Sequence, residues 1–571
     1  MYKKQAVLPI KGKQPVAIAN HSFPNMGGID VSLYTHWLRL LAIAWECATR
    51  NFLCFDLILP YPTTYFKYSN IYLFPCLSLI GHDIIYQYRS RCLLNQRCTV
   101  CMVFSSLTFL YLFLPACLLL YFVLPSRSAK NWFLTAASLF FYAWGEPVWV
   151  CLLLVSALLG YLCGLVINKY RGKPAAKAAL ALSLTGCLGL LFTFKYVDFL
   201  LGSAGLLLTR SVPVAGLVMP IGISFFTFQT MSYVIDLYRG NTQVQRSFLH
   251  LLLFVSLFPQ LIAGPILRYK DIAEQITDRH ETIKDVAEGL FRFSVGLGKK
   301  VLIANYIGKT ADSLLKGDLS ALTVGEAWLG IMCFAFQIYF DFSGYSDMAI
   351  GLGRVFGFRY PENFRYPYIS LSATEFWRRW HISLGSFFRD YVYISLGGNR
   401  KFQARNIMVT WMLTGLWHGA SWNFILWGLY YGLLLVLEKT VLAPVLSRFK
   451  PLAGLYTAAA VLTGWALFYF TDFTDAVMVL GVMWGFAASA LWTDSAWILL
   501  VNNLPLLLLA AFASTPLAAG ATGKIRSLAE DSTLWRSVYG LSMTVFGVFL
   551  LLLSTVSLTT AGYNPFLYFR F

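Results

Sequence analysis

The sequence predicts an all-α protein that crosses a membrane many times. Of its 571 residues, 58% are hydrophobic and only 13% are Asp, Glu, Lys or Arg, which is about half the charged share of an ordinary soluble domain. Apolar runs of about 20 residues, the length that a helix needs to cross a bilayer, recur along most of the chain. Because backbone polar groups in lipid must be satisfied internally, we expect these runs to be helices.

The charge of the chain fits the same class. The net charge is +18, and loops on the cytoplasmic side of a membrane collect Lys and Arg, so the surplus predicts membrane lipid and no nucleic acid as its partner. Two residues separate Cys98 from Cys101, but no second cysteine pair or nearby histidine accompanies them. No metal site is therefore predicted.

Residues 1–101 differ from the rest. They carry scattered charges and six of the eleven cysteines, without an apolar run of spanning length or the layout of a signal peptide. At Met102 the first membrane segment begins, MVFSSLTFLYLFLPACLLLYFVLPSR. We expect 1–101 to be either an atypical N-terminal extension or upstream sequence that is not native, and favour the second, with Met102 as the true start and 102–571 as the membrane domain.

Apolar segments follow one another after Met102. Those expected to cross or enter the membrane are 103–124, 132–144, 148–167, 178–194, 212–237, 248–263, 327–340, 407–437, 454–470, 477–491, 497–518 and 538–553. Basic residues follow the first and third, which places those loops in the cytoplasm. Pro213 and Pro220 interrupt the fifth segment, and irregular backbone at membrane depth indicates a cavity. Because several segments are short, we expect about 11 crossings.

One region, 354–405, is too polar to span. It holds nine Lys and Arg against three acids, together with many aromatic residues. We predict an amphipathic helix from about Ser372 that lies at the cytoplasmic interface or dips into it, with Ser372 and Glu375 as a capping box. One face of this helix would carry Trp377, His381, Leu384 and Phe388.

His418 lies inside the uncharged stretch 406–437. An ionisable side chain inside a membrane segment costs free energy unless it is paired or faces a cavity, so it indicates a functional site. Gly415 and Gly419 permit close approach of a ligand, and a low dielectric favours the neutral imidazole that a general base requires. A histidine hydrogen-bonded between two helices is the alternative, and the residues alone leave it open. No GxSxG or HExxH motif offers a competing site.

Several stretches resemble membrane-bound O-acyltransferases, and the closest branch is that of the membrane subunit of bacterial alginate O-acetyltransferase, which is related to D-alanyl-lipoteichoic-acid transfer proteins. The motifs are YFDFSGYSD from Tyr339, EFWRRWHISLGSFFRDYVYISLGGNR from Glu375 and GLWHGASWNFILWGLYYG from Gly415. Further matches are MVFSS from Met102, FFYAWGEP, MPIGISFFTFQTMSYVIDLYRG, FPQLIAGPI and the closing YNPFLYFRF. The resemblance therefore spans 102–571.

The resemblance implies a ring of tilted and re-entrant helices around a central tunnel in the bacterial cytoplasmic membrane. The histidine of WHG, His418, would be catalytic, and the histidine of WRRWH, His381, would be a second active-site group. The expected reaction moves an acetyl group from a cytosolic thioester, acetyl-CoA, to an extracellular polysaccharide such as alginate. No cofactor is expected to be bound, and an exported SGNH-type acetyltransferase is the expected partner protein.

The same resemblance assigns other site residues. Trp377, Arg378 and Arg379 are expected to shape the donor entrance, although a solvated face explains the two arginines equally well. Trp417, Asn423 and Asp341 are expected along the tunnel. We interpret Asp341 and the other polar residues of DFSGYSD mainly as groups that pack helices together and form hydrogen bonds between them.

Two other functions compete with acyl transfer. The chain is alternatively a transporter or flippase of polysaccharide precursors, or a non-catalytic membrane scaffold of an acetylation complex. The histidine pair, the lack of intramembrane Lys or Arg partners and the lack of an internal repeat favour the acyltransferase.

Overall fold

The structure is a computed structural model that describes residues 102–208, 216–488, 490–530, 532–560 and 563–567. The expectation for residues 1–101 lies outside the described residues. Helices dominate these ranges and no β-strand occurs in them, which confirms the predicted all-α class.

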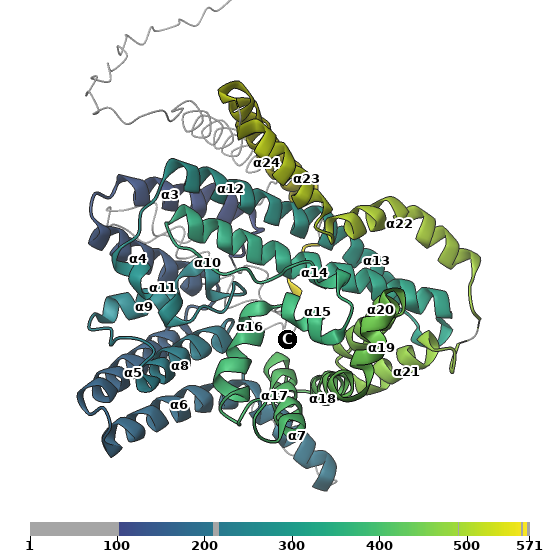
Figure 1. Ribbon diagram of the computed structural model, residues 1–571, viewed down its shortest axis with the longest axis horizontal. Coiled ribbons are helices and arrows are strands. Elements are labelled where there is room, and N and C mark those ends of the chain that lie inside the picture. The colour runs from purple at the N-terminus through teal and green to yellow at the C-terminus, as the bar shows by residue number, and fades with distance from the viewer. Residues whose placement is uncertain (1–101, 209–215, 489, 531, 561–562, 568–571) are drawn as a thin grey trace, which may run out of the picture.

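The helices fall into three consecutive groups along the chain (Figure 1). The first contains η2 (Phe109–Phe113), α3 (Leu114–Val123), α4 (Arg127–Gly145), α5 (Val150–Lys169), α6 (Pro174–Lys195), α7 (Val197–Leu208), α8 (Ile223–Arg239), α9 (Phe248–Ser256), α10 (Phe258–Leu261) and α11 (Tyr269–Thr277). The second contains α12 (Ile283–Gly298), η3 (Lys299–Ala304), α13 (Asn305–Leu315), η4 (Leu319–Ala321), α14 (Val324–Val355), η5 (Pro367–Ile369), α15 (Ala373–Arg379), α16 (Ile382–Phe388), η6 (Arg389–Tyr393) and α17 (Gln403–His418). The third contains α18 (Trp422–Leu437), η7 (Glu438–Leu442), α19 (Ala443–Arg448), α20 (Lys450–Tyr469), α21 (Phe473–Met483), α22 (Asp494–Ala513), α23 (Leu517–Glu530) and α24 (Thr533–Thr560).

The long helix α14 runs through the middle of the molecule beside α12 (Figure 1). Glycines allow the two backbones to approach closely: a Cβ atom added to Gly296 would lie 2.5 Å from the Gly344 carbonyl oxygen, and one added to Gly351 would lie 2.5 Å from that of Gly289. Small residues at helix crossings are typical of membrane proteins, where packing replaces the hydrophobic effect as the driving force.

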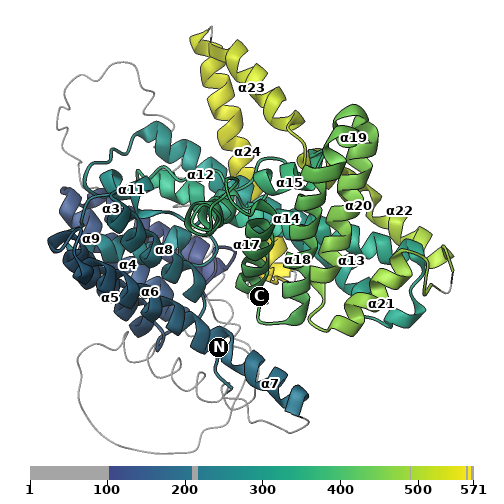
Figure 2. The same ribbon diagram turned by 60° about the horizontal axis from the view of Figure 1, so that its bottom comes forward.

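The central helices α15, α16 and α17 lie between two helical groups, with α3 to α9 on one side and α18 to α22 on the other (Figures 1 and 2). One apolar core includes Phe104 and Phe258, the other includes Trp427 and Trp465, and both also include residues of α14. A smaller cluster around Phe228, Phe387 and Trp417 joins α8, α16 and α17. The central helices are therefore held from both sides.

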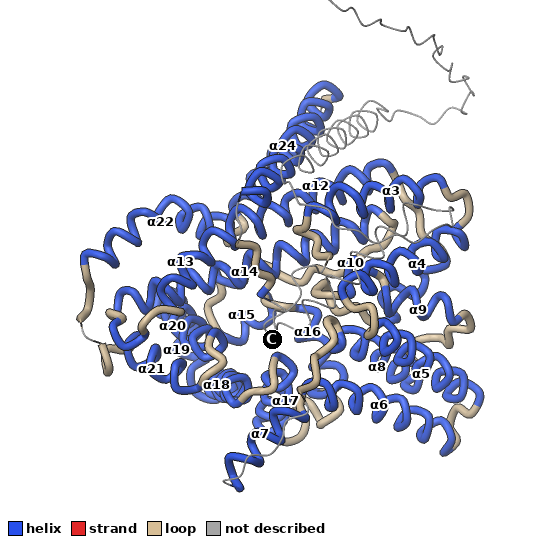
Figure 3. The backbone as a smooth tube through the Cα atoms, turned by 180° about the vertical axis from the view of Figure 1, so that it is seen from behind, coloured by secondary structure: helices blue, strands red, loops and turns tan. Residues whose placement is uncertain are grey.

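Within the described ranges, six helices are long and apolar enough to cross a membrane: Val150–Lys169, Pro174–Lys195, Trp422–Arg448, Lys450–Tyr469, Asp494–Ala513 and Thr533–Thr560. Two shorter apolar stretches, Phe109–Val123 and Phe473–Met483, accompany them. The protein is thus a multi-pass membrane protein built from helices (Figure 3). The expected number of about 11 crossings stays a prediction.

Three sequence expectations are wrong in their local geometry. The amphipathic helix from Ser372 is two short helices, α15 and α16, because the chain breaks at His381, whose φ of 43° is left-handed. His381 itself is buried inside the protein. The segment 407–437 is the hairpin α17–α18, which turns at Gly419, so that His418 ends a helix. The segment 327–340 belongs to the much longer α14.

Candidate active site

The turn between α17 and α18 places His418. The helices pack so tightly that a Cβ atom on Gly415 would lie 2.1 Å from the Phe424 carbonyl oxygen. The last carbonyl groups of α17 have no partner within the helix and are satisfied from α6 and the residue after it. The Lys195 ammonium donates to the carbonyl oxygens of Trp417 and His418, and the Tyr196 hydroxyl donates to that of Leu416 at 2.8 Å. A cation at a helix C-terminus also interacts favourably with the negative end of the helix dipole.

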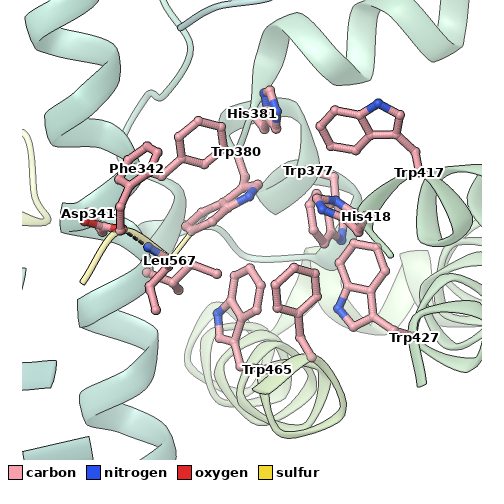
Figure 4. A pocket seen from close by; sticks show the side chains of 13 residues that line it. Asp341, Phe342, Trp377, Trp380, His381, Trp417, His418, Trp427, Trp465 and Leu567 are labelled. Atoms are coloured by element: carbon pink, nitrogen blue, oxygen red, sulfur yellow. Dashed lines mark hydrogen bonds between the residues drawn. The ribbon is translucent and has the colours of Figure 1, made fainter. Parts of the chain in front are cut away.

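Aromatic rings surround the half-buried His418 imidazole (Figure 4). Its ring centroid lies 4.9 Å from that of Trp417, 5.1 Å from that of Trp427 and 5.1 Å from that of Phe468. Among the described residues, neither ring nitrogen of His418 has a hydrogen-bond partner. Both nitrogens are therefore free to exchange a proton with a substrate.

His381 reaches the same cavity from the break between α15 and α16. Its Nδ1 lies 3.1 Å from the Asn363 Oδ1 atom. That atom must be the amide oxygen, because the Ser383 backbone N–H also donates to it at 3.2 Å and an N–H cannot donate to an NH2 group. Nδ1 of His381 must therefore carry the proton, which leaves the lone pair of the neutral ring on Nε2.

The Nε2 atom of His381 is buried and has no hydrogen-bond partner among the described residues. Asn363 is itself fixed, because its Nδ2 donates to the Ser346 hydroxyl on α14 at 3.0 Å. The ring of Trp417 lies near both histidines, with its centroid 6.0 Å from that of His381. The fold thus leaves one lone pair of defined position on a ring that lines the same cavity as His418.

The cavity between the histidines is narrow, with a volume of about 40 Å³, which is room for only a few atoms. Its lining is Ile338, Asp341, Phe342, Trp377, Trp380, His381, Trp417, His418, Trp427, Trp465, Phe468, Phe566 and Leu567. The indole N–H groups of Trp377, Trp417 and Trp427 are buried without a hydrogen-bond acceptor in the described residues. An apolar wall with a few unsatisfied polar groups is typical of a small-molecule site.

Asp341 joins the cavity to the end of the chain. Its carboxylate pairs with the buried Lys300 at 2.5 Å and accepts the backbone N–H of Leu567 at 3.0 Å. Lys300 also donates to the Pro565 carbonyl oxygen. Because these bonds hold the closing segment in place, Phe566 and Leu567 form part of the cavity wall.

The structure brings five of the eight predicted site residues together: His418, His381, Trp377, Trp417 and Asp341 all line the cavity. The other three lie outside its lining. Arg378 is exposed, Arg379 is paired with Glu375 at 2.7 Å, and Asn423 donates its side-chain N–H to the Phe470 carbonyl oxygen at 2.8 Å.

Sequence reasoning missed Asn363, Lys195 and Lys300. Asn363 lies in RYPENFRYP, a loop whose polar composition gives no hint of a buried role. The two lysines contradict the expectation that the region holds no Lys partner, because Lys195 binds carbonyl groups next to His418 and Lys300 binds Asp341. In the described ranges, no three His, Cys, Asp or Glu side chains lie together as a metal site requires.

The chain is similar in sequence to known membrane acyltransferases. Residues 138–472 match the membrane-bound O-acyltransferase family. The probable alginate O-acetylase AlgI of Azotobacter vinelandii is 39% identical over 502 residues, which cover 82% of this chain and all of that protein. The peptidoglycan O-acetyltransferase of Helicobacter pylori is 36% identical over 67% of this chain and 80% of its own length. The teichoic acid D-alanyltransferase of Streptococcus thermophilus is 32% identical over 38% of this chain and 56% of its own.

Proposed function

The chain belongs to the membrane-bound O-acyltransferase family, as its motifs predicted, and from this premise we propose that it acetylates a polysaccharide outside the bacterial cytoplasmic membrane. Membership makes it a membrane O-acyltransferase that uses an acyl donor. Two similar proteins carry the names of an alginate and a peptidoglycan O-acetyltransferase, which supports acetyl as the group and a polysaccharide as its acceptor. We propose acetyl-CoA as the donor, alginate as the acceptor, and an exported SGNH-type acetyltransferase as the partner.

The observation that carries this proposal is the pair of histidines in one apolar cavity. His418 takes the proton from the acceptor hydroxyl while its oxygen attacks the thioester carbonyl carbon. The C–O bond forms, the C–S bond breaks, and the departing thiolate receives the proton back from the His418 imidazolium. No covalent intermediate on the enzyme is needed.

His381 has a supporting role in this reaction. The lone pair on Nε2 is available to a polar group in the cavity, because the opposite nitrogen of His381 is committed to Asn363, and it helps to stabilise the charge on the protonated His418 ring. A charge that forms inside an apolar cavity needs such a pre-oriented partner. An unpartnered indole N–H of Trp377, Trp417 or Trp427 is a suitable donor to the oxyanion of the intermediate.

The donor enters from the cytosolic side in this proposal. Trp377 lines the cavity, and the next residue, Arg378, is exposed. An exposed cation at the mouth attracts the phosphates of acetyl-CoA. Arg379 acts more indirectly, because its guanidinium is bound to Glu375 and holds α15 together.

Substitution of each histidine tests the proposal. In cells that make the acetylated polymer, His418→Ala should abolish acetylation while the protein accumulates in the membrane at the wild-type level. His381→Asn should lower acetylation strongly without abolishing it. Asn is chosen because it tolerates the left-handed backbone of this position better than Ala. His280→Ala is the matched control, since that side chain is 87% exposed in a loop.

Unchanged acetylation in the His418→Ala protein would contradict the assignment and favour a scaffold. Loss of polymer export, with normal acetylation of the polymer that remains inside, would favour a transporter. The O-acetyl content of isolated polymer and an immunoblot of the membrane fraction measure all of these outcomes.

A further inference from the structure

A second cavity lies apart from the histidines and shares none of their lining residues. It has a volume of about 930 Å³ and lies between α12 and α14 on one side and the hairpin α23–α24 on the other. Figure 1 shows this hairpin leaning away from the body of the molecule. The volume falls within the range of about 300 to 1,000 Å³ that is usual for ligand pockets.

The charge of this cavity is positive. Five cationic side chains and three carboxylates line it. Arg292 is paired with Asp347 at 2.8 Å, and Arg526 lies 3.6 Å from Glu288. The cations are Lys284, Arg292, Arg354, Arg526 and Arg536. The surplus of two cations indicates an anionic ligand.

Two of these cations are not paired with a carboxylate among the described residues. Lys284, on α12, is exposed, and no ion pair or hydrogen bond of its side chain is present there. Arg536, on α24, is also exposed and donates only to the Glu530 carbonyl oxygen, at 2.9 Å. They line the same cavity, Lys284 from α12 and Arg536 from α24.

Most of the other residues that line the cavity are apolar. Ala287, Phe291 and Val295 form its α12 wall, and Met543 adds to it from α24. The ring centroids of Phe291 and Phe546 lie 6.5 Å apart, which brings the two helices together next to the cavity. A ligand that fills this space must therefore combine an anionic group with an apolar part.

The position of the cavity indicates what kind of molecule such a ligand is. Only 17% of the most apolar window of α24 is buried inside the protein, so its outer surface must face acyl chains. Basic residues at this end of the helix place it at the cytoplasmic leaflet, which is the leaflet rich in anionic lipid. We propose that the cavity binds one anionic phospholipid, with its phosphate between Lys284 and Arg536 and its acyl chains along Ala287, Phe291 and Val295.

The test uses the full chain, purified in detergent and freed of lipid. Native mass spectrometry measures the dissociation constant of dioctanoyl phosphatidylglycerol, of its zwitterionic counterpart dioctanoyl phosphatidylcholine, and of inorganic phosphate as a competitor. Lys284→Gln/Arg536→Gln should weaken phosphatidylglycerol binding about 30-fold, because each basic side chain at an anionic lipid contributes about a factor of five. The matched control is Lys177→Gln/Arg448→Gln, which removes two exposed cations outside the cavity.

A second variant, Ala287→Trp, fills the apolar part without changing a charge. It should weaken phosphatidylglycerol binding while leaving the thermal unfolding midpoint in detergent near that of the wild type. Equal binding of the two lipids, or equal loss in the control pair, would overturn the proposal. Displacement of the lipid by millimolar inorganic phosphate would identify a free-phosphate site and overturn it as well.

Discussion

Replacing Asn363 with Ala separates the orientation of His381 from its chemistry. Asn363 is buried and accepts three hydrogen bonds through Oδ1, from His381 Nδ1 at 3.1 Å and from the Ser383 backbone N–H and hydroxyl at 3.2 and 2.9 Å. Loss of the bond to His381 removes the preference for the tautomer with its lone pair on Nε2. A net hydrogen bond contributes about 1 to 1.5 kcal/mol, so kcat should fall about 5- to 13-fold.

The Michaelis constant for the donor should stay near the wild-type value, because Asn363 is not part of the cavity lining. The assay is thiol release from acetyl-CoA by membrane vesicles that contain the acceptor polymer, with the donor concentration varied. Asn131→Ala is the control for general destabilisation, since Asn131 is equally buried and binds the Ile276 carbonyl oxygen within the first helical group.

Combining Asn363→Ala with His381→Asn gives a more decisive test of the positioning role. If Asn363 acts through His381, then Asn363→Ala should have no further effect on kcat in the His381→Asn protein. Multiplied losses in the double variant would refute this reasoning. A loss in Asn363→Ala that exceeds the loss in His381→Asn would refute it too, because a positioning residue cannot contribute more than the group it positions.

Three further substitutions test the supports of the site. Glu438→Gln should lower the unfolding free energy by about 1 to 3 kcal/mol, measured by thermal unfolding in detergent, because its buried carboxylate accepts both backbone N–H groups that begin α15. Lys195→Met should lower kcat and the unfolding midpoint together, since it leaves the carbonyl oxygens at the end of α17 unsatisfied; wild-type values for both would contradict that support. Burial alone would raise the pKa of the Glu281 carboxyl, but hydrogen bonds from Tyr121 and Arg127 hold that pKa below its usual value. The resulting stability is present above the unfolded-state pKa and is lost as the pH falls through the lower folded-state pKa. The unfolding midpoint should therefore drop as the pH falls below the ordinary glutamate value of about 4.5 in the wild type, and drop less in Glu281→Gln.

The long apolar helices could be predicted from the sequence because their composition alone determines them. The predicted segment 148–167 is α5, Val150–Lys169, and the predicted segment 454–470 is α20, Lys450–Tyr469. In each, basic residues or proline flank an apolar run of spanning length. No tertiary partner is needed to decide where such a helix begins and ends.

The extent of α14 could not be predicted in this way. Polar residues from Asp341 onward, Ser346 and Asp347 among them, end the predicted segment at residue 340, but the helix continues to Val355. The fold satisfies both side chains: Ser346 accepts a hydrogen bond from Asn363, and Asp347 pairs with Arg292 and Lys299. Hydropathy cannot register partners that lie far away in the sequence.

The break at His381 has the same cause. WRRWHISLG contains no proline, and its only glycine follows the break. The left-handed backbone is held instead by the loop that contains Asn363: the Ile382 N–H donates to the Asn363 carbonyl oxygen at 2.9 Å, and the Arg365 N–H donates to that of Arg379 at 2.9 Å. These pairings turn the ring inward, away from the face that a continuous helix would have given it.

The buried lysines change the reason for preferring an enzyme to a transporter. The sequence predicts no Lys or Arg partner inside the membrane, which argues against a transporter. In the structure, however, Lys195 lies beside His418 and Lys300 lies beside Asp341. Neither ammonium is available to carry an ion, because Lys195 is bound to two carbonyl groups and Lys300 to a carboxylate and a carbonyl group. The positive charges that a transport pathway for anions would need instead hold α17 and the closing segment in place. What then supports the proposed acyltransferase over a transporter is an oriented lone pair on His381 and an uncommitted imidazole on His418 in one narrow cavity, an arrangement suited to exchanging a proton with a substrate.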